Sequence, residues 1–110
     1  MTTPKRLFRG GPSLVPRPSD IKVDPATGLV RPGRGVSVQS VPDGLDRFGG
    51  AFELSGLPPT LTVIQTGRNP NHYEICPINP MTVAEYADAL AGIGLTPPQP
   101  STGDANDPAP

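Results

Sequence analysis

Residues 68–93, RNPNHYEICPINPMTVAEYADALAGI, decide the fold, because they hold the only His, the only Cys and both Tyr residues of the chain together with its clearest helix pattern. Residues 72–78 are typical of a β-strand, since Tyr and Ile favour strands and Pro77 ends ladder pairing on its side. An Asn-Pro pair then breaks the chain before a helix that we expect to open at Thr82. A strand followed at once by a short helix is therefore the centre of the predicted domain.

Successive side chains of a strand point to opposite faces of the sheet, so the predicted strand has two distinct sides. One side carries His72, Glu74 and Cys76, and the other carries Tyr73 and Ile75. Tyr73 shares the side of Ile75, which favours a place in the core. For His72, a hydrogen-bonded structural role is the alternative to a catalytic one. Cys76 is expected to be an inert, partly buried thiol.

The helix after Thr82 has both a start signal and an apolar stripe. Thr82 and Glu85 have the spacing of a capping box, in which each side chain accepts a backbone N–H at the helix start. The apolar stripe consists of Val83, Tyr86, Ala87 and Leu90. Gly92 or Gly94 is expected to end the helix.

The composition limits the protein to one small domain. The chain has 110 residues with 13 Gly and 17 Pro, aromatic residues make up 5%, and there is no Trp. Such a chain builds only a small core, so its stability is expected to be marginal or partly supplied by a ligand or partner. We expect the domain over residues 5–95 and a disordered Pro-rich tail over residues 96–110.

Further strands are expected before and after a long Pro-rich connection, residues 12–34. These strands are residues 5–9, 36–41, 51–54 and 61–66, in addition to residues 72–78. In residues 36–41, alternation puts Ser37 on the face opposite Val36 and Val38. Five short strands, one C-terminal amphipathic helix and long Pro/Gly-rich loops predict a small α+β fold that is mainly β.

Basic residues concentrate in the first third of the chain, although the formal net charge is only −1. Seven of the nine Lys and Arg residues lie there, namely Lys5, Arg6, Arg9, Arg17, Lys22, Arg31 and Arg34. Such a segment suits an anionic ligand, a nucleic acid or an acidic protein partner, and an ordinary solvated surface is the alternative.

The Cys and His content excludes two classes of site. One Cys cannot form an internal disulfide, and one Cys with one His cannot complete a four-ligand zinc site, so no metal is expected. No apolar run reaches membrane-spanning length, and the N-terminus lacks the apolar core of a signal peptide. We therefore expect a cytoplasmic protein with no membrane partner, and export by a route that needs no signal peptide stays open.

Two catalytic patterns lead to different conclusions. The loop with Gly33 and Gly35 begins like a dinucleotide fingerprint, but it lacks the third Gly and leads into a strand, which excludes a Rossmann site. Ser37, His72 and Glu74 supply the residue types of a Ser-His-acid triad. That triad stays open, although no nucleophile elbow accompanies it.

Four short motifs occur in one order along the chain. They are Leu7-Phe8-Arg9, then Gly35-Val36-Ser37-Val38, then Leu57-Pro58-Pro59 with Leu61 and Val63, then His72-Tyr73-x-Ile75-x-Pro77-x-x-Pro80-Met81. In this order they resemble the small type VI secretion effector toxins of bacteria with an ADP-ribosyltransferase-like fold, over residues 5–93. The resemblance implies an NAD-dependent toxin that acts in the bacterial cytosol and is held inactive by a cognate immunity protein.

Under this resemblance NAD is the substrate, and Arg9, Ser37 and Glu74 are the catalytic candidates. The bond between nicotinamide and ribose breaks through an oxocarbenium-like state, as in glycoside hydrolysis. Arg9 offers a cationic fork for a phosphate, and Glu74 offers a carboxylate to stabilise the cation or activate the acceptor. The implied cofactor-binding residues are Arg9, Gly10, Gly35, Ser37, His72 and Tyr73, with Phe8 as a second aromatic candidate for nicotinamide.

Two functions are compatible with these residues. The first is an NAD-dependent ADP-ribosyltransferase or NAD glycohydrolase toxin with an unknown macromolecular target and a cognate antitoxin. The second is a catalytically inactive binding module of the same fold, which would bind nucleic acid or an acidic protein through the basic residues 17–34.

Overall fold

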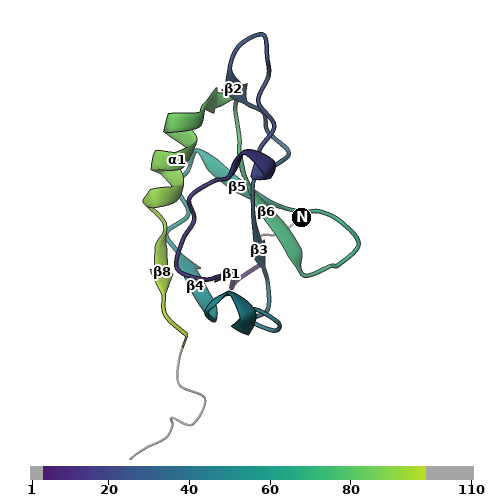
Figure 1. The fold of residues 1–110 in the computed structure, drawn as a ribbon, viewed down its shortest axis with the longest axis vertical. Helices are drawn as coiled ribbons and strands as arrows, with labels where there is room; N and C mark the ends of the chain where they lie inside the picture. Colours follow the sequence, from purple (N-terminus) through teal and green to yellow (C-terminus); the bar gives the residue numbers. More distant parts are fainter. Residues whose placement is uncertain (1–3, 99–110) are drawn as a thin grey trace, which may run out of the picture.

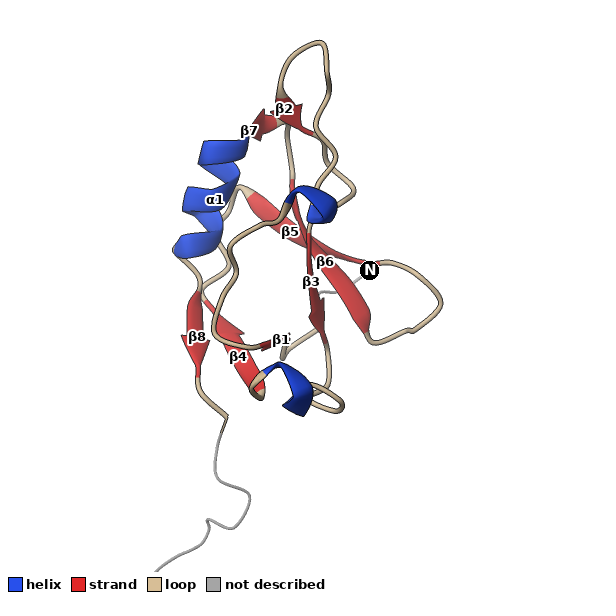
Figure 2. Ribbon diagram, in the orientation of Figure 1, coloured by secondary structure: helices blue, strands red, loops and turns tan. Residues whose placement is uncertain are grey.

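Strand β6 (His72–Pro77) lies inside a six-stranded antiparallel sheet in the computed structural model, which describes residues 4–98 (Figure 1). The strand order across the sheet is β5-β6-β3-β1-β4-β8. The other five strands are β1 (Phe8–Gly10), β3 (Val36–Gln39), β4 (Ala51–Ser55), β5 (Leu61–Gln65) and β8 (Gly94–Thr96). A second sheet of β2 (Leu29–Val30) and β7 (Met81–Thr82) adjoins the start of helix α1 (Val83–Ala91), as Figure 2 shows. Two 3-10 turns, η1 (Pro18–Asp20) and η2 (Asp46–Phe48), lie in the loops.

The sequence-based fold class is confirmed at the level of a mainly antiparallel β structure with one helix. The strands expected within residues 36–41, 51–54, 61–66 and 72–78 are all present, and β6 ends at Pro77. The strand expected over residues 5–9 is shorter and shifted, because pairing with β4 starts only at Phe8.

Strand β8 was not expected from the sequence, and its last residue, Thr96, is the first residue of the predicted tail. Residues Gly94–Thr96 pair with β4, where Leu95 faces Leu54, and both leucines pack against the core. Three residues that include a Gly carry too weak a pattern to indicate a strand; the long-range pairing with β4 creates it. The part of the predicted tail from residue 99 onward lies outside the described residues.

Helix α1 forms where the capping box predicts it. The backbone N–H of Glu85 donates to the Thr82 hydroxyl at 3.0 Å, and the Thr82 N–H donates to the Glu85 carboxylate at 2.8 Å. Gly92 is the C-cap, with an ordinary right-handed φ of −79°. The predicted stripe is wrong at Val83, which is 42% exposed, because the buried side of the helix begins one turn later at Tyr86. In residues 4–98 no helix has the length and apolar character to cross a bilayer.

The six-stranded sheet consists of two halves with a single residue pair between them. Within one half, β5 and β6 share five residue pairs and β3 and β6 share four. Within the other half, β1 and β4 share three, as do β4 and β8. Between the halves, β1 and β3 pair only at Phe8 and Gln39. The two strands therefore separate on one side of this pair, and the sheet opens there.

The hydroxyl of Tyr86 holds α1 against the sheet. Tyr86 is fully buried, and its hydroxyl donates to the carbonyl of Ile75 at 2.5 Å and accepts the N–H of Val36 at 3.0 Å. Val36 and Ile75 face each other across β3 and β6, so one side chain of the helix joins both strands. Burial raises the pKa of Tyr86 to about 12, which keeps the hydroxyl protonated and able to donate at neutral pH.

We expect Tyr86→Phe to lower the free energy of unfolding by about 2 kcal/mol, because it leaves a buried N–H and a buried carbonyl without their partner. Tyr73→Phe is the matched control, since the Tyr73 hydroxyl has no hydrogen-bond partner recorded among residues 4–98. Denaturant unfolding measures both variants. Equal stabilities of the two variants would show that the Tyr86 hydroxyl does not hold the strands.

The contact of the Tyr86 hydroxyl with β3 and β6 requires a glycine at position 35. A Cβ at this position would lie 1.7 Å from the carbonyl oxygen of Ile75 and 2.5 Å from the Tyr86 hydroxyl. We expect Gly35→Ala to cost more than about 4 kcal/mol, the range of severe core disruptions, or to prevent folding. Gly92→Ala should leave stability unchanged or improve it slightly, since its φ is ordinary and its nearest neighbour is at 3.5 Å. Thermal and denaturant melts compare the two, and a well-folded Gly35→Ala would contradict this account.

Candidate functional site

A cleft of about 520 Å³ lies where β1 and β3 separate. Its apolar walls are Phe8, Val15, Val38, Leu45 and Phe48, and its cations are Arg9, Arg17 and Arg47. Gly10, Ser13, Ser37, Gln39 and His72 complete the lining. The cleft therefore combines an aromatic surface with three positive charges, which suits an anionic ligand that also has a flat apolar part.

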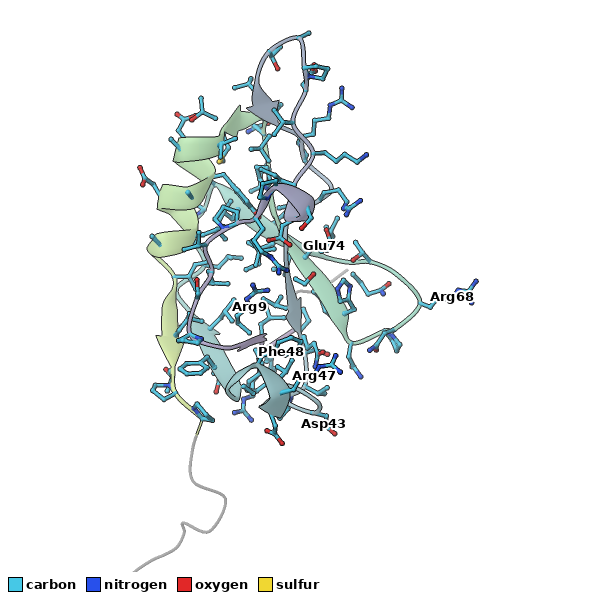
Figure 3. The ribbon with its side chains drawn as sticks, in the orientation of Figure 1. Arg9, Asp43, Arg47, Phe48, Arg68 and Glu74 are labelled. Atoms are coloured by element: carbon cyan, nitrogen blue, oxygen red, sulfur yellow. The ribbon has the colours of Figure 1, made fainter. Side chains whose placement is uncertain are left out.

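Arg9 bridges the open side of the sheet. Its Nη1 donates to the carbonyl of Ser37 at 2.8 Å, and its Nε donates to the carbonyl of Ser13 at 3.0 Å. The side chain is half-buried and points inward from β1 (Figure 3). Desolvation lowers the pKa of the guanidinium below its ordinary value, but the group stays charged at neutral pH. Nη2 has no recorded acceptor among residues 4–98, so it is available to a ligand.

Ser37 and His72 meet in the cleft from neighbouring strands. The Nε2 of His72 lies 3.2 Å from the Ser37 hydroxyl. The Nδ1 of His72 lies 3.0 Å from the hydroxyl and 3.1 Å from the carbonyl oxygen of Thr66, the residue that follows β5. Register explains the meeting, because Ser37 pairs with Glu74 across β3 and β6, two positions from His72 on the same face.

Glu74 lies on the same face as this pair but is buried and does not line the cleft. It is 8% exposed, and its carboxylate accepts the Thr66 hydroxyl at 2.8 Å and the Gly35 N–H at 2.9 Å. Arg34 lies 3.4 Å from the same carboxylate. These three partners satisfy the buried charge. Glu74 therefore reaches the cleft only through Thr66 and His72.

The predicted site residues divide into two groups. Arg9, Gly10, Ser37 and His72 line the cleft together. Glu74, Gly35 and Tyr73 do not, since Gly35 serves the Tyr86 joint and Tyr73 packs partly against the core. Of the two aromatic candidates for a flat ligand group, only Phe8 lies at the cleft.

The Phe48 ring packs where Gly10 has no side chain. A Cβ on Gly10 would lie 2.7 Å from the Phe48 ring, so the glycine makes room for that ring. Phe48 is 52% exposed, and the guanidinium of Arg47 lies 4.9 Å from its centroid. The exposed part of this ring faces the cleft lining together with the Arg47 cation, so the pair offers an apolar face and a charge to a ligand.

The sequence did not indicate Arg47, Phe48 and Thr66 as residues of the site, and it indicated Arg17 only as part of the basic segment 17–34. Arg47-Phe48-Gly49-Gly50 carries a usable signal, because an aromatic and a cation beside two glycines stand outside every predicted strand. Thr66 has no such signal. Its role arises only because it follows β5 and comes next to His72 across the loop, where its N–H donates to the His72 carbonyl at 3.1 Å.

Two other chemistries find no support among residues 4–98. No three His, Cys, Asp or Glu side chains gather there as ligands for a metal ion. Cys76 is buried, and its burial raises the pKa of the thiol to about 11, so the thiol stays protonated at neutral pH. Searches of family descriptions, curated proteins and solved structures find no match for this chain.

We expect Arg9→Ala to lower the free energy of unfolding by about 2 kcal/mol, since the Ser37 carbonyl loses a charge-assisted hydrogen bond. Arg9→Lys should restore only part of the loss, because one ammonium cannot reproduce the fork that spans two carbonyls. Arg68→Ala is the control, as Arg68 is exposed and points away from the cleft at the tip of the β5–β6 loop (Figure 3). Denaturant unfolding of the three variants measures whether stability rises from Arg9→Ala through Arg9→Lys to Arg68→Ala. An Arg9→Ala protein as stable as the control would refute this expectation.

Proposed function

We propose that the chain is a bacterial toxin of ADP-ribosyltransferase-like type that uses NAD as its substrate. One observation carries the proposal: Arg9, Arg17 and Arg47 surround an aromatic-walled cleft that also contains the Ser37–His72 pair. The motif resemblance over residues 5–93 names the same cleft residues Arg9, Ser37 and His72. Two independent considerations, motif and geometry, thus favour one cleft.

The three arginines suit a pyrophosphate. Arg9 offers its Nη2, while Arg17 is 72% exposed and touches Asp20 only at 3.5 Å. Arg47 contacts the Phe48 ring. None of these cations is held in a close, buried ion pair, so a bound phosphate would gain their charge at small cost to existing contacts.

The apolar wall and the polar pair suit the other half of NAD. The exposed ring of Phe48 offers a stacking surface for nicotinamide or adenine. Ser37 and His72 supply a hydroxyl and an imidazole in the same cleft, and these groups can give and take a proton in a ribose-transfer reaction. Glu74, behind Thr66, acts on this reaction only as a positioning residue.

The ADP-ribosyltransferase-like fold is part of the proposal. The supporting feature is the two-part sheet, whose halves share one residue pair and leave a cleft beside it. A cognate immunity protein then neutralises the toxin by covering the mouth of this cleft near Arg9, Ser37 and His72. The proposed place of action is the bacterial cytosol, where NAD is available.

A binding module that uses the basic residues 17–34 is less favoured. Arg34 lies 3.4 Å from the buried Glu74 carboxylate, so this loop cation already neutralises a buried charge. Binding to nucleic acid through several Lys and Arg contacts weakens steeply with salt, whereas a dinucleotide held by few charge contacts responds less. Salt dependence of binding therefore separates the two functions.

We expect the purified chain to bind NAD and release nicotinamide, and its induced expression in bacteria to stop growth. The double variant Arg17→Ala/Arg47→Ala should weaken NAD binding by about tenfold, since exposed charge contacts contribute about 1 kcal/mol or less each. Arg68→Ala, a charge loss of the same kind outside the cleft, should bind as the parent does. Isothermal titration and nicotinamide release measured by chromatography provide the data.

Three results decide the outcome. Growth arrest and nicotinamide release that both disappear in His72→Ala, with its fold intact by circular dichroism, support the enzyme. Accumulation without growth arrest, together with steeply salt-dependent RNA or DNA binding, favours the binding module. NAD binding that falls equally in Arg68→Ala and in the double variant would remove the assignment of this cleft.

A further inference from the structure

The network behind His72 determines which of its ring nitrogens carries the proton. Nδ1 faces the carbonyl oxygen of Thr66 at 3.1 Å, and a carbonyl can only accept. Nδ1 also faces the Thr66 hydroxyl at 3.0 Å, whose own proton is donated to Glu74 at 2.8 Å, so that oxygen accepts as well. Nδ1 therefore carries the hydrogen in neutral His72, and Nε2 has a free lone pair.

That lone pair faces a hydroxyl. Nε2 lies 3.2 Å from the Ser37 oxygen, so Ser37 is placed to donate its proton to His72. The chain of contacts from Ser37 through His72 and Thr66 to Glu74 has the logic of a catalytic triad, with a threonine inserted before the acid. An imidazolium formed at His72 would be stabilised by the Glu74 carboxylate through Thr66.

We propose that Ser37 is a nucleophile and that it accepts ADP-ribose from NAD bound in the cleft, which makes it a self-modification site of this chain. The proposal rests on the proposed use of NAD. In the step, the Ser37 oxygen forms a bond to C1′ of the nicotinamide ribose, and the bond from C1′ to the nicotinamide nitrogen breaks. The bonding electron pair leaves with neutral nicotinamide, and the Ser37 proton passes to Nε2 of His72. No oxidant, reductant or metal is needed.

Ser37 is distinguished from the other serine of the cleft by its partners. Ser13 also lines the cleft, but its hydroxyl oxygen accepts the N–H of Val15 at 3.2 Å and has no basic partner recorded among residues 4–98. Arg9 holds both backbones, at 2.8 Å for the Ser37 carbonyl and 3.0 Å for the Ser13 carbonyl, so the His72 contact is what distinguishes Ser37. Ser55→Ala is the control for Ser37→Ala, because Ser55 is exposed at the end of β4 and does not line the cleft.

The test incubates the full chain with NAD, quenches it at successive times and maps peptides by mass spectrometry. We expect one ADP-ribose on the peptide that contains Ser37, held by an acetal bond that survives denaturation. Ser37→Ala should remove the adduct, and Ser55→Ala, a change at an exposed serine of β4 outside the cleft, should leave its rate unchanged. His72→Asn should slow adduct formation by about 100-fold, the usual contribution of a general base.

Thr66 and Glu74 are positioning residues, and substitution at Thr66 tests them without emptying the core. Thr66→Val keeps the carbonyl acceptor and the size of the side chain but removes the link to Glu74. It should slow adduct formation by about tenfold, the value of one hydrogen bond to a charged group. Thr66→Ser restores the hydroxyl and should recover the rate, which a purely structural role would not require.

The tautomer has its own measurement. His72 is the only histidine of the chain, so ¹⁵N-histidine labelling yields the two ring nitrogens of one residue. At a pH where the ring is neutral, Nδ1 should show the shift of a protonated, pyrrole-type nitrogen and Nε2 that of an unprotonated, pyridine-type nitrogen. Free imidazole side chains prefer the opposite tautomer, so this result would report the Thr66 contacts. A ring protonated at Nε2 would overturn the proposal.

The remaining outcomes separate this inference from the proposed function. Nicotinamide release at the same rate in Ser37→Ala, with no adduct on the parent chain, overturns the role of Ser37 and leaves NAD as the substrate. An adduct on Ser13 or on another residue with Ser37 unmodified also overturns it. Absence of both NAD binding and nicotinamide release, with the ring protonated at Nδ1, overturns the proposed use of NAD and this inference together.

Discussion

The Tyr86 hydroxyl is the joint on which the arrangement of the protein depends. A buried phenol that donates to Ile75 and accepts from Val36 joins the helix to two adjacent strands at once. The close approach leaves no space for a side chain on Gly35, whose N–H instead donates to Glu74 at 2.9 Å. Helix, sheet and the buried carboxylate behind the cleft thus share one small region, so changes in helix packing are expected to reach the site.

The open side of the sheet is the second constraint. Strands β1 and β3 share a single pair, and the guanidinium of Arg9 provides the hydrogen bond to Ser37 that the ladder does not. A cationic side chain in place of backbone pairing has two consequences. It keeps the halves of the sheet together, and it leaves positive charge at the wall of a cleft. The same residue therefore joins the halves of the sheet and forms part of the cleft wall, so its substitution is expected to change both.

The polar partners of Glu74 allow its carboxylate to be buried. A carboxylate with 8% exposure is costly unless hydrogen bonds replace its hydration, and here the Thr66 hydroxyl, the Gly35 N–H and the Arg34 guanidinium do so. Because two of these partners come from the loop before β3 and one follows β5, the carboxylate links both neighbours of β6. The Thr66 hydroxyl contacts both the Glu74 carboxylate and His72, so the buried charge is linked to a residue of the cleft.

The sequence by itself determined the elements whose signals are local. The capping box at Thr82 and Glu85, the alternation in β3 and β6 and the β-branched run of β5 are properties of neighbouring residues, and each of these elements is present. The resemblance carried by four short motifs brought Arg9, Ser37 and His72 forward as candidates. Only the tertiary structure decided that β8 pairs with β4, that Phe48 fits over Gly10 and that Thr66 stands between His72 and Glu74. Such contacts depend on strand register and on the separation of β1 from β3, which bring distant residues together and leave no periodic trace in the chain.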